Sequence, residues 1–438
     1  MLVAFALAIM ADPISSVAYA IEAALGELNS DLRLILPTMG LVVLVIAIIV
    51  VNYRQLVSRF PQGGGAPAAT GRAFGEPWAF LPIGALIVDF ALTIAISVSS
   101  GASNIVAYPP ELAPLQVVLA LGLLLVVGAI SWFGHSARSL FSVMAITFVA
   151  MSIVVFIDGV DAEPVASAVE SGESSHPALV AILLAFPVAM ALATGVEAPS
   201  TAIAQLGQLD NEGRQRFGRL ALLATLLIVG TLTLGFTALA VRLGVGLPVG
   251  ESTLTAEIAR ASAGGVVFAA FQTGIILLLI AAGASGLQAG PGLLKALARE
   301  RTGDDEVTGV LPEWLGRTNR YYTPFWGLLV YGVLTVILVL AAAADEQTLV
   351  LFYAVSVFLS FLAGLVSMIV FSYREGKRRS LALNTVGTLV VAFVLMMNLA
   401  RVTPLASLGA TLLIASGLYW LWVKNGRPRG IAGAETTE

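Results

Sequence analysis

The chain has 438 residues, of which 58% are hydrophobic and 11% are charged, and its mean hydropathy is +0.93. This composition excludes a water-soluble globular protein and indicates a polytopic membrane protein. Cysteine is absent, which excludes disulfides and thiolate metal sites. The net charge of −4 is uninformative, because the distribution of charge matters more than its sum, and we expect no nucleic-acid partner.

Apolar segments near the length of about 20 residues that a membrane helix requires recur along the whole chain. In chain order we expect twelve spans, at 2–27, 32–52, 76–104, 114–131, 139–157, 178–204, 218–242, 263–287, 324–343, 346–371, 383–399 and 405–423. The prediction is an all-α transporter domain over residues 1–424, followed by a short cytoplasmic tail over 425–438.

Two features of the loops stand out in this series. Gly63, Gly64 and Gly65 follow the second span without any phosphate-binding pattern, so we interpret them as a hinge. In the longest loop, 288–323, residues Gly290 to Arg301 are expected to form an amphipathic helix that precedes a polar turn.

The distribution of basic residues predicts how the spans are oriented. All but four of the 23 lysines and arginines fall in loops that are cytoplasmic if the N-terminus is inside. The charged residues of the 158–177 loop, by contrast, are all aspartates and glutamates. The four exceptions are Arg33, Arg242, Arg260 and Arg401. By the positive-inside rule, both termini are cytoplasmic in a plasma-membrane protein.

The first and sixth spans are interrupted by matching sequences. Asp12–Ser16 and Glu197–Thr201 each contain an acid, a proline within two residues and then two hydroxyl side chains, 185 residues apart. Ser100–Ser103 in the third span and Ala282–Ser285 in the eighth are similar at an offset of 182 residues. These offsets predict a five-helix unit used twice, with the second copy inverted because five is odd.

The repeat divides the membrane domain into three parts. Repeat one covers about 2–157, repeat two covers about 178–371, and the last two helices cover about 383–423. Paired interrupted helices at equivalent positions of two halves point to the central substrate site of a transporter. Their unwound backbone can supply carbonyl ligands to a cation.

Three acids lie inside these apolar segments without a lysine or arginine nearby: Asp12, Asp89 and Glu197. One carboxylate at the centre of a membrane helix costs about 2.5–3.5 kcal/mol even on the lenient insertion scale, so these acids need protons, a cation or water. On the third span, Asp89, Thr93 and Ser97 recur every four residues and share one helix face over about 12 Å. Carboxylate, hydroxyl and carbonyl oxygens are the ligands that replace the water of a hard monovalent cation, which favours cation transport.

The motifs resemble those of the KimA-type potassium transporters, a KUP-related branch of the amino acid–polyamine–cation superfamily. The resembling stretches cover the membrane part and are Asp12–Tyr19, Tyr53–Gln55, Phe60–Gly65, Val88–Gly101, Thr194–Ala198 and Leu351–Phe358.

This resemblance implies a five-plus-five inverted-repeat fold with broken helices one and six, and potassium uptake driven by protons. It also implies that Glu197 is the proton-coupling carboxylate. The implied potassium ligands are Asp12, Tyr19, Asp89, Thr93, Ser97, Thr194 and Tyr353. We expect no counterpart in this chain of the large cytosolic C-terminal domain of that family. We therefore make no prediction of the oligomeric state.

The main alternative is a proton-coupled amino acid or cationic amine permease of the same superfamily. Such carriers hold the substrate carboxylate on glycine-rich unwound backbone in helix one, whereas this chain has Asp12 and Pro13 there. A membrane receptor and a membrane enzyme are further alternatives, but the chain contains no signalling domain, metal-ligand cluster or activated nucleophile that we can identify. We therefore expect no enzymatic activity and no cofactor apart from the transported K⁺ and H⁺, with the lipid bilayer and a small cation as the partners.

Overall fold

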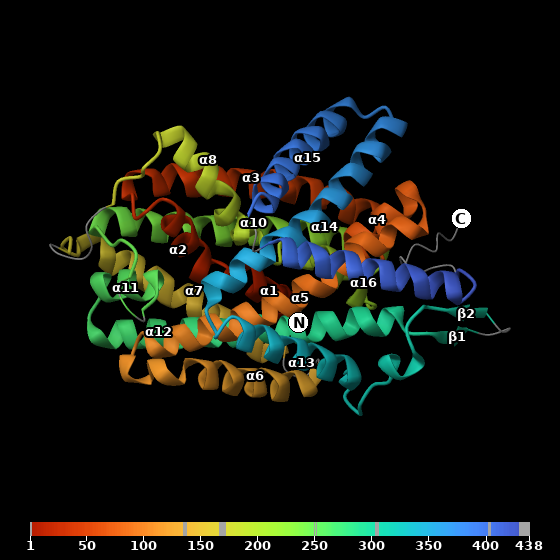
Figure 1. Ribbon diagram of the computed structural model, residues 1–438, viewed down its shortest axis with the longest axis horizontal. Helices are drawn as coiled ribbons and strands as arrows, with labels where there is room; N and C mark the ends of the chain where they lie inside the picture. The colour runs from red at the N-terminus through yellow and green to blue at the C-terminus, as the bar shows by residue number, and fades with distance from the viewer. Residues whose placement is uncertain are drawn as a thin grey trace.

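A computed structural model describes residues 2–134, 138–165, 172–248, 250, 252–302, 306–401 and 404–428. It is a bundle of long, nearly parallel and antiparallel helices (Figure 1). A two-stranded antiparallel hairpin, β1 (Glu300–Thr302) and β2 (Glu306–Thr308), projects from one end of the bundle.

Within the described residues, eleven segments are long and apolar enough to cross a bilayer, and α13 is a shorter apolar helix of 17 residues. These twelve elements correspond one to one with the twelve predicted spans, so the expected all-helical polytopic fold is confirmed. The uninterrupted helices are α3 (Leu32–Arg59), α5 (Glu76–Val106), α6 (Gln116–Trp132), α7 (Arg138–Asp161), α10 (Asn211–Leu243), α12 (Gly265–Leu297), α13 (Phe325–Ala341), α14 (Glu346–Arg374), α15 (Arg378–Leu399) and α16 (Leu405–Lys424).

The first and sixth spans are discontinuous, as predicted. The first span comprises α1 (Leu2–Ser15) and α2 (Val17–Glu27), which meet at a turn on Ser16. The sixth comprises α8 (Ala178–Ala189), the 3₁₀ turn η3 (Met190–Ala193), an irregular stretch at 194–197, α9 (Ala198–Ala202) and η4 (Ile203–Gln205). Proline supplies no backbone N–H, so Pro13 removes one backbone hydrogen bond near the end of α1, whereas Pro199 is tolerated in the first turn of α9.

The breaks of the two discontinuous spans are buried, because Asp12, Ser16, Thr194 and Glu197 are each at most 5% exposed. The long helix α5 packs against α12, α14 and α4 (Gly65–Phe74), while α3 packs against α10. The pairs α3 with α10 and α5 with α12 each join helices that the predicted repeat makes equivalent. The inversion itself and the domain boundaries stay predictions.

The bundle has a basic end and an opposite end. We define the basic end by the last residues of α3, α12 and α14, at the side of Figure 1 where α4 and the β-hairpin lie. The opposite end carries α2, α11 (Leu254–Ser262) and the first turns of α8. A short 3₁₀ helix, η1 (Pro110–Leu115), precedes α6, and η5 (Glu313–Gly316) follows the hairpin.

One loop prediction needs correction, and the expected hinge at Gly63–Gly65 stays a prediction. The separate amphipathic helix expected at Gly290 to Arg301 is wrong, because residues up to Leu297 continue α12 and the following residues enter the hairpin. The three glycines form a tight turn, with positive φ angles of 90°, 90° and 51° at Gly63, Gly64 and Gly65. Since a Cβ on Gly63 would lie 2.7 Å from the Cβ of Ala204, this turn is packed against the sixth span.

Three minor expectations concern the loops and the tail. His176 is exposed in its loop, as expected. His135 and Glu170 lie outside the described residues, and so does the tail beyond residue 428.

Candidate functional site

The two helix breaks use their hydroxyl side chains in the same way. In the first span, Ser15 donates to the carbonyl of Asp12 (2.7 Å) and Ser16 to the carbonyl of Pro13 (2.7 Å). In the sixth, Ser200 donates to the carbonyl of Glu197 (2.7 Å) and Thr201 to that of Ala198 (3.1 Å). Each hydroxyl therefore satisfies a carbonyl three residues earlier at an interruption, and the correspondence at an offset of 185 residues extends from sequence to hydrogen bonds.

The breaks also contact each other. Ser16 makes a second hydrogen bond to the carbonyl of Leu192 (3.1 Å), next to the unwound part of the sixth span. Gly195 has a positive φ of 69°, and a Cβ there would lie 2.7 Å from the Cγ and Oδ2 atoms of Asp12. Only glycine fits this position, because it tolerates both the left-handed backbone and the close approach.

This approach brings the three predicted acids into one buried cluster. Asp12 is 5% exposed, Asp89 is 2% exposed and Glu197 is 4% exposed. The carboxyls of Asp89 and Glu197 are in side-chain contact, and Asp12 interacts electrostatically with both. The three carboxyls come from α1, α5 and the break of the sixth span, so the fold assembles them from separate parts of the sequence.

These carboxyls have no basic partner among the described residues. The ion pairs that the structure contains join other residues: Arg33 with Asp31 and Glu173, Arg59 and Lys377 with Glu375, Arg260 with Glu257, and Arg401 with Glu27. One carboxylate oxygen each of Asp12, Asp89 and Glu197 is buried and makes no hydrogen bond to a described residue. Uncompensated buried charge is unstable, so this cluster must hold protons or a cation.

Three neutral oxygens predicted as ligands lie at the cluster. The Tyr19 hydroxyl lies beside the side chains of Thr194 and Ser15, and Tyr19 interacts electrostatically with Asp12 and Asp89. The Thr194 hydroxyl donates to the carbonyl of Ala191 (2.5 Å), which leaves its lone pairs available to a cation. The Tyr353 hydroxyl is close to Asp89, but it makes no hydrogen bond of acceptable geometry to any described residue.

The remaining predicted ligands, Thr93 and Ser97, lie on α5 one and two turns beyond Asp89 and are 3% and 2% exposed. Neither hydroxyl makes a hydrogen bond to another residue in the described ranges, unlike Thr225 on α10, which bonds the carbonyl of Ala221 (2.9 Å). A Cβ on Gly283 would lie 3.5 Å from the Cβ of Ser97, which places this part of the face against α12. These two hydroxyls are therefore free to bind a ligand.

Sequence reasoning missed two tyrosines near the acids. Tyr53 is fully buried and interacts electrostatically with Glu197 and Asp89, and Tyr331 of α13 is fully buried and interacts with Asp89. Both hydroxyl oxygens are buried without a hydrogen-bond partner in the described part of the chain. Tyr53 was placed just beyond a span predicted to end at 52, whereas α3 continues to Arg59 and carries it inside the protein.

A cavity of about 470 Å³ lies toward the basic end. Phe90 and Ala198, the neighbours of Asp89 and Glu197 in sequence, line it together with Gln62, Gln205 and Gln288. The carboxyls of Asp12, Asp89 and Glu197 do not themselves line this cavity.

Polar contacts close the opposite end. Thr253 donates to the side-chain oxygen of Asn104 (3.2 Å), and Gln272 donates to the Asn104 carbonyl (2.9 Å). Ser103 donates to Glu346 (2.6 Å), and the backbone N–H of Leu254 donates to Glu22 (2.8 Å). The cavity thus lies toward the basic end, whereas polar contacts join the helices at the opposite end.

The comparisons with known proteins agree with this architecture. The sequence profile of the amino acid permease family matches residues 2–426. A curated relative, the potassium transporter KimA of Bacillus subtilis (strain 168), is 29% identical over 331 residues, which are 74% of this chain and 52% of the relative. The chain therefore spans about half the length of the curated relative it matches, and the resemblance to KimA-type transporters is confirmed.

Both comparisons are with transport proteins, which agrees with the expectation of a transporter rather than an enzyme. The chain is a multi-pass membrane protein, and it belongs to the amino acid permease family.

Proposed function

We propose that this protein imports potassium ions together with protons through the carboxyl cluster of Asp12, Asp89 and Glu197. The single observation that carries the proposal is that these three buried acids meet with no basic partner among the described residues. A monovalent cation and a proton are the ligands that such a cluster needs. No cofactor is required beyond these transported ions.

The oxygens around the acids favour potassium over sodium. Around Asp12 and Asp89, the proposed ligands are the hydroxyls of Tyr19, Thr93, Ser97, Thr194 and Tyr353. Most of this set is neutral, and neutral oxygens replace the hydration shell of potassium more readily than the tighter shell of sodium. Tyr53 joins the site as a further buried hydroxyl.

Glu197 is the proposed proton carrier. It lies at the unwound part of the sixth span, in side-chain contact with Asp89, so the two carboxyls repel each other when both are ionised. A proton on Glu197 relieves this repulsion, and its release into the cavity restores the repulsion as the site changes sides. Each charge that moves down 100 mV supplies about 2.3 kcal/mol, which is available for potassium accumulation.

The orientation follows from the basic residues. We assign the basic end and both termini to the cytoplasm of a plasma-membrane protein. The four basic residues at the opposite end all have partners there: Arg33 with Asp31, Arg260 with Glu257, Arg401 with Glu27, and Arg242 with the carbonyl of Gly159. Three of these charges are paired with carboxylates and the fourth is hydrogen-bonded to a carbonyl, so they do not oppose this orientation.

An amino acid or cationic amine is the alternative substrate, and the family to which the chain belongs favours it. Asp12 argues against an amino acid, because its carboxylate occupies the break of the first span where a substrate carboxylate would bind. An amine would suit the charge, but it needs room beyond a single-ion site.

Uptake into a potassium-uptake-deficient host separates these substrates. The wild type should restore growth at low potassium and accumulate labelled rubidium, and unlabelled amino acids should not compete. Uptake of a labelled amino acid or amine without rubidium uptake would reject potassium as the substrate.

A further inference from the structure

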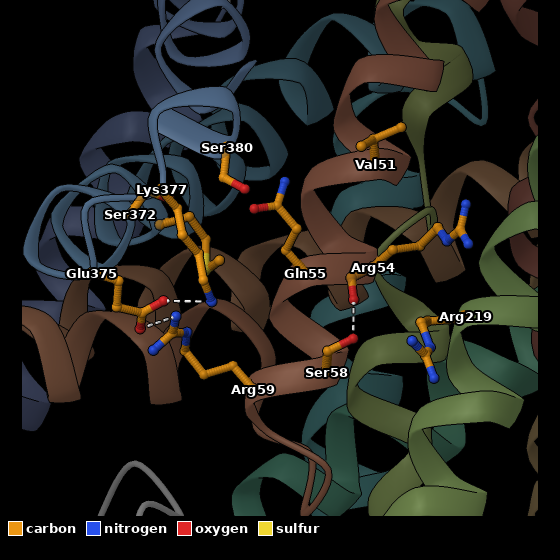
Figure 2. Close-up of a pocket in the computed structure, with 11 residues that line it drawn as sticks. Val51, Arg54, Gln55, Ser58, Arg59, Arg219, Ser372, Glu375, Lys377 and Ser380 are labelled. Carbon is orange, nitrogen blue, oxygen red and sulfur yellow. Dashed lines mark hydrogen bonds and ion pairs between the residues drawn. The ribbon is translucent and has the colours of Figure 1, made fainter. Parts of the chain in front are cut away.

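A second cavity, of about 650 Å³, lies at the basic end between α3, α10, α14 and α15 (Figure 2). None of the predicted ion-site residues lines it. Its walls carry four basic side chains and one acidic side chain, namely Arg54, Arg59, Arg219, Lys377 and Glu375. The charge of this cavity is thus opposite to that of the ion site.

The acid is already engaged on one side of the cavity. Glu375 forms ion pairs with Arg59 and with Lys377 (2.9 Å), which Figure 2 shows as dashed lines. The Lys377 ammonium and the Arg59 guanidinium hold the pKa of the Glu375 carboxyl below its usual range, so it stays ionised. These two cations therefore neutralise the charge of Glu375. The Nε atom of Arg59 is buried and makes no hydrogen bond to a described residue.

The other side has two arginines without an acidic partner in the described ranges. Arg54 comes from α3 and Arg219 from α10, and Figure 2 shows them away from Glu375. The only side-chain bond that the structure gives Arg219 is to a carbonyl of its own helix, from Nε to Gln215 (3.3 Å). Two partly buried guanidinium groups in one cavity repel each other unless an anion binds between them.

Two residues that line the cavity, Gln55 and Ser372, belong to a polar network behind its wall. Asn384 is fully buried and accepts hydrogen bonds from Asn52 (2.9 Å) and Gln55 (3.3 Å), and it donates to Ser372 (3.0 Å). This network ties α3 to α14 and α15, so the walls that carry the basic side chains are held in place. A fixed cavity of this kind can bind a ligand without reorganising.

We propose that this cavity binds a phosphate group, held by Arg54 and Arg219. Arginine side chains bind phosphate oxygens through two parallel N–H donors. The phosphate comes from an acidic lipid of the adjacent leaflet or from a soluble phosphate. Val51, which lines the cavity, is 39% exposed, so it provides an apolar surface for an acyl chain and favours the lipid.

The test uses the full chain in detergent and in nanodiscs, and it measures binding without any transported ion. Native mass spectrometry compares adducts of phosphatidylglycerol with those of zwitterionic phosphatidylcholine. A thermal-shift titration with inorganic phosphate covers the soluble source. The variant is Arg54→Gln/Arg219→Gln. Its matched control is Arg216→Gln/Arg378→Gln, which removes the same charge from exposed positions of α10 and α15 outside the cavity.

We expect phosphatidylglycerol binding to fall by about tenfold or more in Arg54→Gln/Arg219→Gln, since a lost charge-assisted hydrogen bond is worth about that factor in affinity. The control should bind as the wild type does, and Arg54→Lys/Arg219→Lys should retain part of the binding. Loss of the phosphate-dependent shift alone, with lipid adducts unchanged, assigns the site to soluble phosphate.

Equal binding by the wild type and the cavity variant, or an equal loss in the control, would overturn the proposal. If the double variant does not fold, Arg54→Gln alone serves, because Arg54 is partly exposed and forms no ion pair within the described chain. All these readouts are independent of transport, so they do not depend on the identity of the transported substrate.

Discussion

Gly195 and Asp12 are packed so closely that a Cβ atom on Gly195 would lie 2.7 Å from the Oδ2 atom of Asp12. The unwound backbone of the sixth span therefore forms one wall of the pocket around the carboxylate of the first. A change at Gly195 should therefore alter the position of Asp12, a proposed ion ligand, without removing any charge.

The substitution Gly195→Ala should weaken potassium binding by about tenfold. A methyl group there displaces Asp12, and the positive φ of 69° costs an alanine about 1–2 kcal/mol. The measurement is the potassium concentration that half-maximally stabilises the purified protein. Gly207→Ala is the control, because its Cβ would meet no atom within 4 Å; equal affinities in both variants would contradict the contact.

Replacing Asp89 with asparagine should reduce transport to background while the protein still folds. The change removes a charge but little volume from the cluster, and Asp89 forms no ion pair among the described residues. Rubidium uptake and size-exclusion profiles measure the two properties. Asp161→Asn, at the exposed end of α7, should transport normally; substantial uptake by the Asp89→Asn variant would remove this residue from the site.

The sequence could predict much of this architecture because its strongest signals are local. Twelve apolar runs mark the spans, and the acid–proline–hydroxyl pattern at Asp12 and Glu197 marks both interruptions. The pairing of the α3–α10 and α5–α12 helices also agrees with the repeat inferred from the two offsets.

The contacts between segments could not be predicted in the same way. Tyr53 appeared to lie beyond its span, because the polar residues after position 52 conceal the last turns of α3, which are buried against other helices. Glu22 of α2 is a second example. It is only partly exposed and accepts a hydrogen bond from Leu254 of α11, a contact between residues 232 positions apart.

The hydroxyls of Thr93 and Ser97 should contribute more to potassium binding than other hydroxyls in the membrane helices. Thr93→Val and Ser97→Ala are each expected to weaken potassium binding several-fold, because a neutral ligand oxygen is lost and a hydrogen bond of this kind contributes about 0.5–1.5 kcal/mol. Thr225→Val is the matched control, since its hydroxyl only bonds its own helix. An effect of the same size at Thr225 would show that helix stability, and not ion binding, explains the loss.

Weakening the closed end should shift the protein toward the opposite conformation. Asn104→Ala removes the hydrogen bond that Thr253 donates. The chain has no native cysteine, so the variant Thr201→Cys, at a position that lines the cavity of about 470 Å³, can report the accessibility of that cavity. Labelling of Thr201→Cys should slow by several-fold in the presence of Asn104→Ala and stay unchanged with Thr237→Ala on α10. Unchanged labelling in the Asn104→Ala background would mean that this contact does not control closure.

The most direct test of the account follows protons and potassium together in reconstituted vesicles that contain a pH-sensitive dye. An inward potassium gradient should acidify the lumen with the wild-type protein. In Glu197→Gln the potassium-dependent proton signal should disappear, while potassium still stabilises the purified variant. Acidification by Glu197→Gln equal to that of the wild type would contradict the role of Glu197, and potassium uptake without any proton signal in the wild type would contradict proton coupling itself.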